Sequence, residues 1–255
     1  GNIVADSAFI SYHGICSSLG YTSGASTLRN SINCTNPHQT VSLFSTLGYT
    51  GISPDAMYDA NGEIWISDKT YNGTDYTDTE ILRHGVWNPV IRQHVYTTKK
   101  IPCPVELKYD NTKSFLTTNI AFSANGQSGY LSVVANNDYV NEPDSSYYII
   151  VFKTTDGGTT WSSGYKIDLD NANGQLSNSC NGNCNTGYQL DGAVDNAGKL
   201  HLIIAVGPWS TGSNIVTIPG RWGMFSVITD AVTNTLQLLD MPMTFRGTFG
   251  GLTED

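Results

Sequence analysis

The chain has 255 residues, 39% of them hydrophobic and 14% charged, which is enough apolar material for one or two packed cores and excludes a disordered tail. Its 13 Lys and Arg against 22 Asp and Glu give a net charge of −9, which argues against binding to a phosphate backbone. No apolar run is long enough for a membrane-spanning helix, and the first residues lack the basic and apolar regions of a signal peptide.

Three hairpins with the same order of features follow one another along the chain. Each has a short apolar strand, a tight turn with glycine and a second apolar strand, and they span 53–66, 119–134 and 191–204. The turn glycines Gly62, Gly126 and Gly198 are separated by 64 and then 72 residues. No helical period exceeds about two turns, so the crossover helices of an α/β fold are missing and an all-β fold is predicted.

A second apolar pair follows each hairpin. The clearest examples are 147–153 with 163–167 and, one unit later, 224–228 with 236–239. Four strands per unit at near-constant spacing predict a β-propeller of four-stranded antiparallel blades. A closed propeller has about four to eight blades. We therefore expect 1–255 to be a single propeller region of about three to four blades and a segment of a longer protein. The alternative is a closed four-bladed ring in which 1–50 supplies a divergent blade.

The turn between the paired strands 147–153 and 163–167 carries the most specific motif. The run Thr154-Thr155-Asp156-Gly157-Gly158-Thr159-Thr160-Trp161 resembles the Asp-box, Ser/Thr-x-Asp-x-Gly-x-Thr-Trp, of sialidase-like and other BNR-repeat propellers. The resemblance implies a structural role on an outer turn. The Asp156 carboxylate would accept backbone N–H bonds, glycine would supply a positive φ, and Trp161 would pack between sheets. The turn 229–233 is a degraded copy, without the Gly or the Trp.

Sialidase activity is a further implication of this resemblance. It would require an arginine triad for the substrate carboxylate, a Tyr/Glu nucleophilic pair and an Asp acid. None of the arginines stands in the Phe/Tyr-Arg-Ile-Pro context that opens sialidase domains; they are Arg29, Arg83, Arg92, Arg221 and Arg246. The motif thus predicts the fold rather than a reaction.

Polar residues stand four positions before the first turn of each hairpin, at Asp55, Asn119 and Asp191. We expect them to begin the inner strands and to face the mouth of the channel, where propeller hydrolases place acids and binding modules place ligand contacts. Asp55 and Asp191 are the candidate catalytic pair, which would lie about 5 Å apart in a retaining enzyme or about 6.5–9.5 Å apart in an inverting one. Asn119 is a candidate ligand-binding residue. The alternative is that all of them cap strands or bond neighbouring blades.

Aromatic residues beside charged ones form a second set of candidates. Trp87, and Trp209 with Arg221 and Trp222, are candidate carbohydrate-stacking residues, while a buried Trp under an exposed loop is the alternative. No cofactor is required by any motif. The oxygen-rich run from Asp168 and Asp170 to Gly174 leaves Ca²⁺ as an option, although it departs from the EF-hand pattern and a polar turn also explains it.

The cysteines favour an oxidising compartment. Cys180 and Cys184 flank a short polar loop and predict a disulfide rather than a zinc site, which needs four ligands. Cys16 and Cys34 are candidates for a second bridge, which leaves Cys103 free or paired outside this segment. With the acidic charge, these cysteines predict a secreted or cell-surface location.

Two functional hypotheses follow from these features. The first is a recognition or adhesion module in which rigid blades present loops to a glycan or protein ligand, without chemical change. The second is a sialidase-like glycoside hydrolase that uses carboxylates at the channel mouth, and a purely architectural spacer is a third possibility. An enzyme requires two carboxylates, or a Tyr and Glu pair, converging in one pocket, whereas a binding module requires only a shaped surface.

Overall fold

The structure of the chain is a computed structural model. The residues it describes are 2–4, 7–16, 25–31, 39–42, 50–51, 55–59, 62–71, 76–91, 93–103, 115–135, 147–169, 172, 175, 184–208, 223–239, 248–249 and 252–253.

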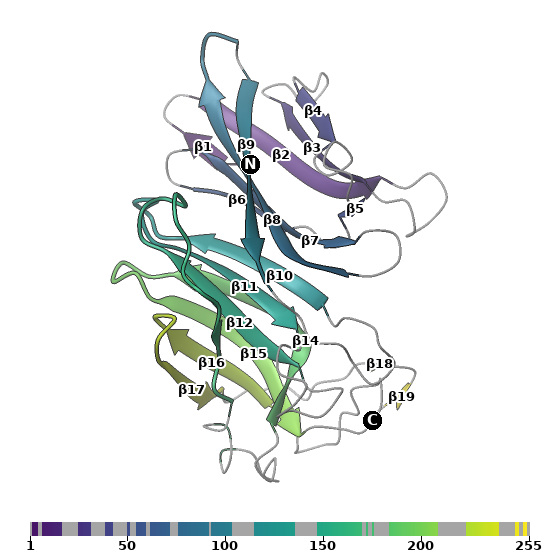
Figure 1. Cartoon of the computed structure of the whole chain (residues 1–255), viewed down its shortest axis with the longest axis vertical. Helices are drawn as coiled ribbons and strands as arrows, with labels where there is room; N and C mark the ends of the chain where they lie inside the picture. The colour runs from purple at the N-terminus through teal and green to yellow at the C-terminus, as the bar shows by residue number, and fades with distance from the viewer. Residues whose placement is uncertain are drawn as a thin grey trace.

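The chain forms four antiparallel sheets in sequence order and a short hairpin (Figure 1). The first sheet contains β1 (Asn2–Val4), β2 (Ser7–Cys16), β3 (Ala25–Ser31) and β4 (Gln39–Ser42). The second contains β5 (Thr50–Gly51), β6 (Asp55–Tyr58), β7 (Ile64–Tyr71), β8 (Tyr76–Asn88) and β9 (Gln93–Pro102).

The third sheet contains β10 (Phe115–Phe122), β11 (Gly129–Ala135), β12 (Tyr148–Thr154) and β13 (Tyr165–Lys166). The fourth contains β14 (Cys184–Val194), β15 (Leu200–Pro208), β16 (Gly223–Thr229) and β17 (Asn234–Leu238). The terminal hairpin pairs β18 (Thr248–Phe249) with β19 (Leu252–Thr253).

The predicted all-β fold with antiparallel sheets is confirmed, and the part of the chain that the structure describes contains no α-helix. In the first, third and fourth sheets every strand pairs with its neighbour in sequence, so each is a meander. In the second sheet, β5 and β6 both pair with β7 and share the place of one strand. The interval between them contains Pro54, which has no N–H for a ladder. The sheets form an open series rather than a closed ring (Figure 1).

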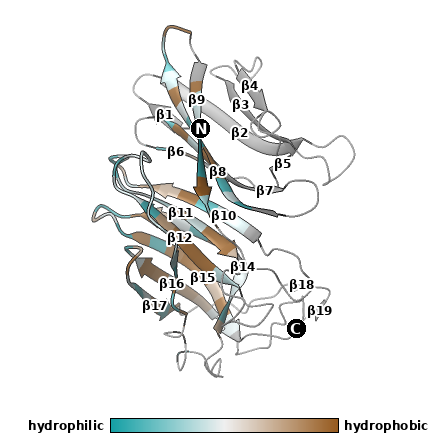
Figure 2. Cartoon of the chain, viewed as in Figure 1, coloured by the Kyte–Doolittle hydropathy of each residue, from teal (hydrophilic) through white to brown (hydrophobic). Residues whose placement is uncertain are grey.

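The third sheet is packed on both faces. Along β11, Tyr130 and Val134 belong to a core shared with the fourth sheet, whereas Leu131 and Val133 belong to a core shared with the second. Alternate side chains of a strand point to opposite faces, so all of β11 is buried. Figure 2 shows the hydrophobic residues concentrated along these central strands. The contacting faces of the second, third and fourth sheets are therefore the cores of the part whose side chains are described.

The predicted hairpins are present, and their turns repeat one geometry. Gly62, Gly126 and Gly198 have φ values of 76°, 70° and 75°, and each donates its N–H to the carbonyl three residues earlier. This left-handed conformation suits glycine because it has no Cβ. The strand starts differ from the expectation, however. Asp55 begins β6, but Asn119 and Asp191 lie inside β10 and β14, whose pairing with β11 and β15 extends further towards the N-terminus.

In the turn between β12 and β13, a backbone N–H bond to Asp156 is present as predicted, and hydroxyl bonds that were not predicted accompany it. The Asp156 carboxylate accepts bonds from the N–H and the hydroxyl of Thr160, at 2.8 and 2.6 Å, and from the Thr154 hydroxyl at 2.8 Å. The Trp161 indole N–H donates to the carbonyl of Gly158 at 3.1 Å. The copy at 229–233 lacks glycine, and Ala231 takes the positive φ there, at 66°.

These bonds predict how acid weakens the turn. The Thr160 hydroxyl and N–H bonds lower the pKa of Asp156 from 3.8 to about 2, so the stabilisation is present above pH 3.8 and is lost as the pH falls towards 2. Asp156→Asn should therefore be less stable than the unmodified chain at neutral pH, and the difference should shrink over that window. Urea unfolding of both proteins from pH 7 to pH 2 measures this, and a pH-independent difference would contradict it.

Candidate functional site

The first strands of the second, third and fourth sheets, β6, β10 and β14, are the inner strands of the fold, and β10 contacts both of the others. They carry Asp55, Asn119 and Asp191 at one level, because these residues pair with Ser67, Ser132 and Ile203 at equivalent positions of β7, β11 and β15. The structure thus places the three sequence-predicted polar residues on neighbouring strands.

Side chains of β10 connect these strands directly. The Thr118 hydroxyl lies 3.2 Å from the hydroxyl of Ser67 on β7, and both are buried. On the other side, a Cβ added at Gly192 would lie 3.3 Å from Asn119 Oδ1, so the Asn119 amide is packed against the backbone of β14. Adjacent residues of β10 therefore contact the second and the fourth sheets, and the inner strands are held at a defined spacing.

The candidate residues differ in accessibility. Asn119 is buried, whereas Asp191 is exposed, with its carboxylate accepting a 2.8 Å bond from the N–H of Gly192. For Asp55 the structure defines the backbone position and not the side chain. Asp191 can therefore reach a ligand in solution, while Asn119 lies beneath this surface and positions the strand that carries it.

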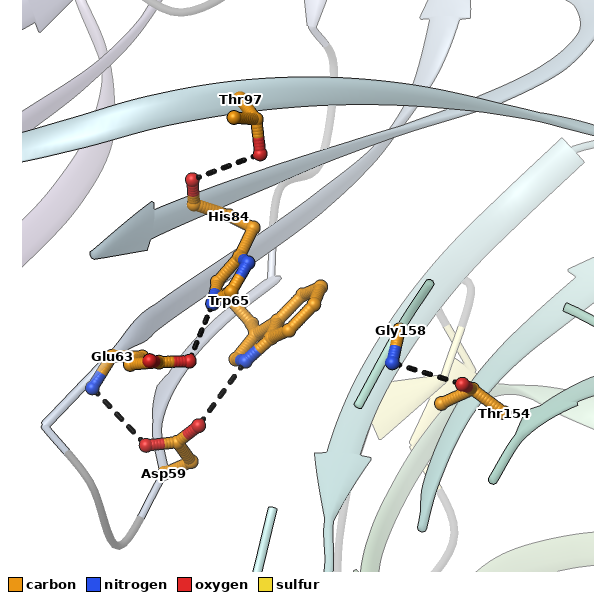
Figure 3. Close-up of polar contacts among 7 residues, drawn as sticks. All are labelled: Asp59, Glu63, Trp65, His84, Thr97, Thr154 and Gly158. Carbon is orange, nitrogen blue, oxygen red and sulfur yellow. Dashed lines mark hydrogen bonds and ion pairs between the residues drawn. The ribbon is translucent and has the colours of Figure 1, made fainter. Parts of the chain in front are cut away.

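A second cluster lies at the turn between β6 and β7 (Figure 3). The Trp65 indole N–H points at the Asp59 carboxylate, 3.4 Å away, and the Glu63 carboxylate lies 2.6 Å from Nε2 of His84. The His84 ring stacks on Trp65 with a centroid separation of 3.8 Å. Sequence reasoning missed this cluster, although an Asp six residues before an aromatic residue across a hairpin was a usable signal.

The Trp65 cluster contacts the next sheet. A Cβ at Gly158, in the turn between β12 and β13, would overlap the Trp65 ring, and Lys99 of β9 donates to the carbonyls of Gly158 and Thr159. One sheet later, the Tyr130 hydroxyl donates to the Gly198 carbonyl at 2.6 Å and Lys153 to the Asp230 carbonyl at 3.3 Å. These contacts join the second sheet to the third and the third sheet to the fourth at the ends where their turns lie. The residues that make them therefore have a structural role.

The predicted aromatic residues fall into two groups. Trp87 lies near the end of β8, before the turn to β9, and is partly buried. Neighbouring strands of this sheet run in opposite directions, so the turn from β8 to β9 lies at the same end of the sheet as the turn from β6 to β7. Trp209, Arg221 and Trp222 lie outside the described residues, between β15 and β16. Their role stays a prediction.

A groove of about 660 Å³ lies between β9 and the segment 159–164, and Cys103 and Trp161 are among its lining residues. Cys103 is fully buried and forms no disulfide within the described part of the chain. Burial, followed by the charges of Glu80 and Asp78, raises the pKa of its thiol far above the usual value. The thiolate needed for nucleophilic chemistry is therefore suppressed. Sequence reasoning did not single out Glu80, a fully buried acid on β8.

The remaining cysteine and metal predictions are only partly covered by the described residues. Cys184 is disulfide-bonded, but Cys180 and Cys34 lie outside that part of the chain, as does the side chain of Cys16, so both pairings stay predictions.

Among the described side chains no group of three or more His, Cys, Asp and Glu could hold a metal. Asp168 is exposed and Asp170 is outside the described ranges, so the Ca²⁺ option is untested. None of the described segments contains a helix long and apolar enough to cross a bilayer.

A scan against protein-family models found no match, and a search of curated proteins found none either. Among solved structures, the chain is similar to an N-acetylgalactosamine deacetylase from F. plautii, with a TM-score of 0.47 and 14% identity over 92% of this chain and 67% of that one.

Two further solved structures resemble the chain. A xylan β-1,4-xylosidase from Bacillus halodurans C-125 has a TM-score of 0.46 and 12% identity over 94% of this chain and 45% of that one. An exo-β-1,3-galactanase from Clostridium thermocellum has a TM-score of 0.30 and 11% identity over 89% of this chain and 59% of that one. The chain thus spans less than two thirds of the length of these two structures.

Proposed function

We propose that this chain is part of an extracytoplasmic β-propeller of the Asp-box type that recognises a glycan at the level of Asp55, Asn119 and Asp191. The observation that carries the proposal is that three neighbouring strands carry these polar residues at equivalent positions of their own sheets. The propeller itself is supported by four antiparallel sheets in chain order, with the third packed between its neighbours.

Recognition in this arrangement is passive. The exposed Asp191 carboxylate accepts hydrogen bonds from sugar hydroxyls, and the buried contacts of Asn119 and Thr118 keep the strands rigid beneath it. Acting on ligands outside the cell agrees with the disulfide at Cys184, because such bonds persist in oxidising compartments. The Asp-box turn contributes stability and makes no contact with the ligand.

Glycan binding tests this proposal. An immobilised panel of neutral and sialylated oligosaccharides should capture the chain, and Asp191→Ala should weaken binding by roughly tenfold or more. Asp55→Ala should act in the same direction. Asn196→Ala, at an exposed turn position on β14–β15, is the matched control and should bind normally. Capture that is equal for all four proteins, or no capture by any glycan of the panel, would contradict the proposal.

Glycoside hydrolysis is the second candidate, because Asp55 and Asp191 are carboxylates on the strands that flank β10. A hydrolase would release reducing sugar from a glycan of the same panel, and either Asp→Asn substitution would abolish turnover. A binding module would show binding without release. The same proteins and the same panel therefore distinguish the two functions.

A further inference from the structure

The groove between β9 and the segment 159–164 has an aromatic ring and a cation beside each other. Trp161 lines the groove and is half-buried, and its indole N–H donates to the carbonyl of Gly158 at 3.1 Å. The Lys99 ammonium donates to the same carbonyl at 2.8 Å, and also to the carbonyl of Thr159. Because one oxygen accepts bonds from both side chains, the ring and the ammonium are held next to one another.

The positive charge of Lys99 has no acidic partner in the part of the chain that the structure describes. Its ammonium contacts two backbone carbonyls and no carboxylate there. An ammonium has three N–H donors, so one donor remains after these two bonds. The described lining of the groove also includes Lys100 and contains no Asp or Glu, although the whole chain has a net charge of −9. This part of the groove therefore presents a fixed cationic donor to an anion.

The charges near the groove define a direction along it. Cys103 follows Lys99 by four residues along the chain, about 13 Å in an extended strand. Burial, followed by the charges of Glu80 and Asp78, raises the pKa of the Cys103 thiol, so negative charge gathers at this end. The apolar floor between the two ends includes Phe152, which is 2% exposed. An anionic group is thus attracted at Lys99 and repelled near Cys103.

The rim and the strand edge of the groove favour a sugar over a peptide. Ser162 and Ser163 are exposed on the rim, where hydroxyls can bond the hydroxyls of a sugar. β9 is the last strand of its sheet, but its exposed residue Pro102 has no N–H for a further strand, and lysines on an edge also discourage strand pairing. The flat indole of Trp161 suits the C–H face of a pyranose ring.

We propose that this groove binds an acidic sugar, with the sugar carboxylate on Lys99 and the pyranose ring against Trp161. Charge complementarity at Lys99 supports an anionic ligand, and the adjoining indole supports a sugar. In a uronic acid the carboxylate is attached directly to the ring, so one sugar unit makes both contacts. The groove volume of about 660 Å³ lies within the range of about 300–1,000 Å³ that is usual for small-ligand sites.

This site is separate from the one proposed at Asp191. It lies on the outer strand β9 of the second sheet and beside β12 of the third, whereas Asp191 is on β14, the inner strand of the fourth. Its ligand is therefore a different one from the glycan at Asp191. The inference does not rest on glycan recognition there.

A matched pair of ligands tests the role of charge. The ligands are trigalacturonic acid and the same trisaccharide with each carboxylate converted to a carboxamide, titrated into the 255-residue chain by isothermal calorimetry at pH 7 and low salt. The acid should bind roughly tenfold or more tightly than the amide, because only the acid makes a hydrogen bond between two charged groups. This preference should shrink at high salt, since the groove is open to solvent.

Lysine variants locate the binding site. Lys99→Met removes the charge and should weaken binding of the acid by roughly tenfold or more, with a much smaller effect on the amide. Lys199→Met makes the same charge change at an exposed residue beside a turn of the fourth sheet and should bind both ligands normally. Asp191→Ala should also bind both normally, which separates this site from the proposed glycan site. Urea unfolding verifies that each variant is folded.

Three results would overturn the inference. The first is equal affinity of the unmodified chain for the acid and the amide, or no binding of the acid, and this result decides even where Lys99→Met does not fold. The second is a folded Lys99→Met that binds the acid as tightly as the unmodified chain. The third is binding of tetraglutamate as tight as that of trigalacturonic acid, because the groove would then take an acidic peptide.

Discussion

Gly158→Ala is expected to lower the free energy of unfolding by about 3–5 kcal/mol, the combined cost of backbone strain and overpacking. Gly158 has a φ of +81°, which an L side chain rarely adopts, and its added Cβ would overlap Cη2 of Trp65 and lie 2.9 Å from Cζ3. The Trp65 ring cannot easily withdraw, because it is stacked between His84 and Phe122. Urea unfolding measures the loss.

The neighbouring Gly157 provides the matched control. Its φ is +64°, but the closest atom to an added Cβ is the Gly126 carbonyl oxygen at 3.5 Å, an ordinary contact. Gly157→Ala should therefore cost only the backbone strain, about 1–2 kcal/mol. Adding Trp65→Leu to Gly158→Ala should recover part of the extra loss, because the clashing ring atoms are gone. Equal losses for the two glycine variants would show that the Trp65 contact does not matter.

Trp65→Ala is expected to lower the free energy of unfolding by about 3–5 kcal/mol, the usual cost of removing a large buried aromatic residue. Trp65 is only 4% exposed and belongs to the core between the second and third sheets. Its removal leaves a cavity beside Phe122 and takes away the stacking partner of His84 and the hydrogen bond to Asp59. Chemical denaturation monitored by far-ultraviolet circular dichroism gives this value without relying on tryptophan emission.

Two variants separate packing from hydrogen bonding at Trp65. Trp65→Phe keeps an aromatic ring but removes the indole N–H, and should cost clearly less than Trp65→Ala. Trp87→Ala changes a partly buried tryptophan of the same sheet and should cost less than either, since large losses require full burial. A loss for Trp65→Ala no greater than that for Trp87→Ala would mean that the interface between the second and third sheets does not depend on this residue.

Local features of the molecule could be predicted from the sequence because their causes lie within a few residues. The hairpin turns at Gly62, Gly126 and Gly198 follow from glycine between short apolar runs, and each glycine has a positive φ in the structure. The sequence predicted Asp156 as an acceptor of backbone N–H bonds in its turn, and it did not predict the hydroxyl bonds from Thr154 and Thr160; all of these bonds join residues at most four apart. The four-stranded repeat followed from the spacing of these turns.

The candidate site could be predicted only in part. Equal distance from the hairpin turns indicated that Asp55, Asn119 and Asp191 are equivalent, and each pairs with an equivalent residue of the next strand in its own sheet. The spacing did not reveal that Asn119 is buried against Gly192 while Asp191 is exposed, because burial depends on which sheet covers each face. The starts of β10 and β14 were misplaced for a related reason, since strand length depends on the pairing partner.

The sequence by itself determined the all-β class, the turn positions and the acceptor role of Asp156 in its turn, because hydrogen bonds between near neighbours and strand periodicity act within short segments. Only the tertiary structure decided that Trp65 packs on Gly158, that Tyr130 bonds Gly198 and that Ile203 is left exposed. These contacts join residues of different sheets, and no local pattern specifies which faces will meet. They arise because each sheet must bury its apolar faces against another sheet, a requirement that three-dimensional packing alone resolves.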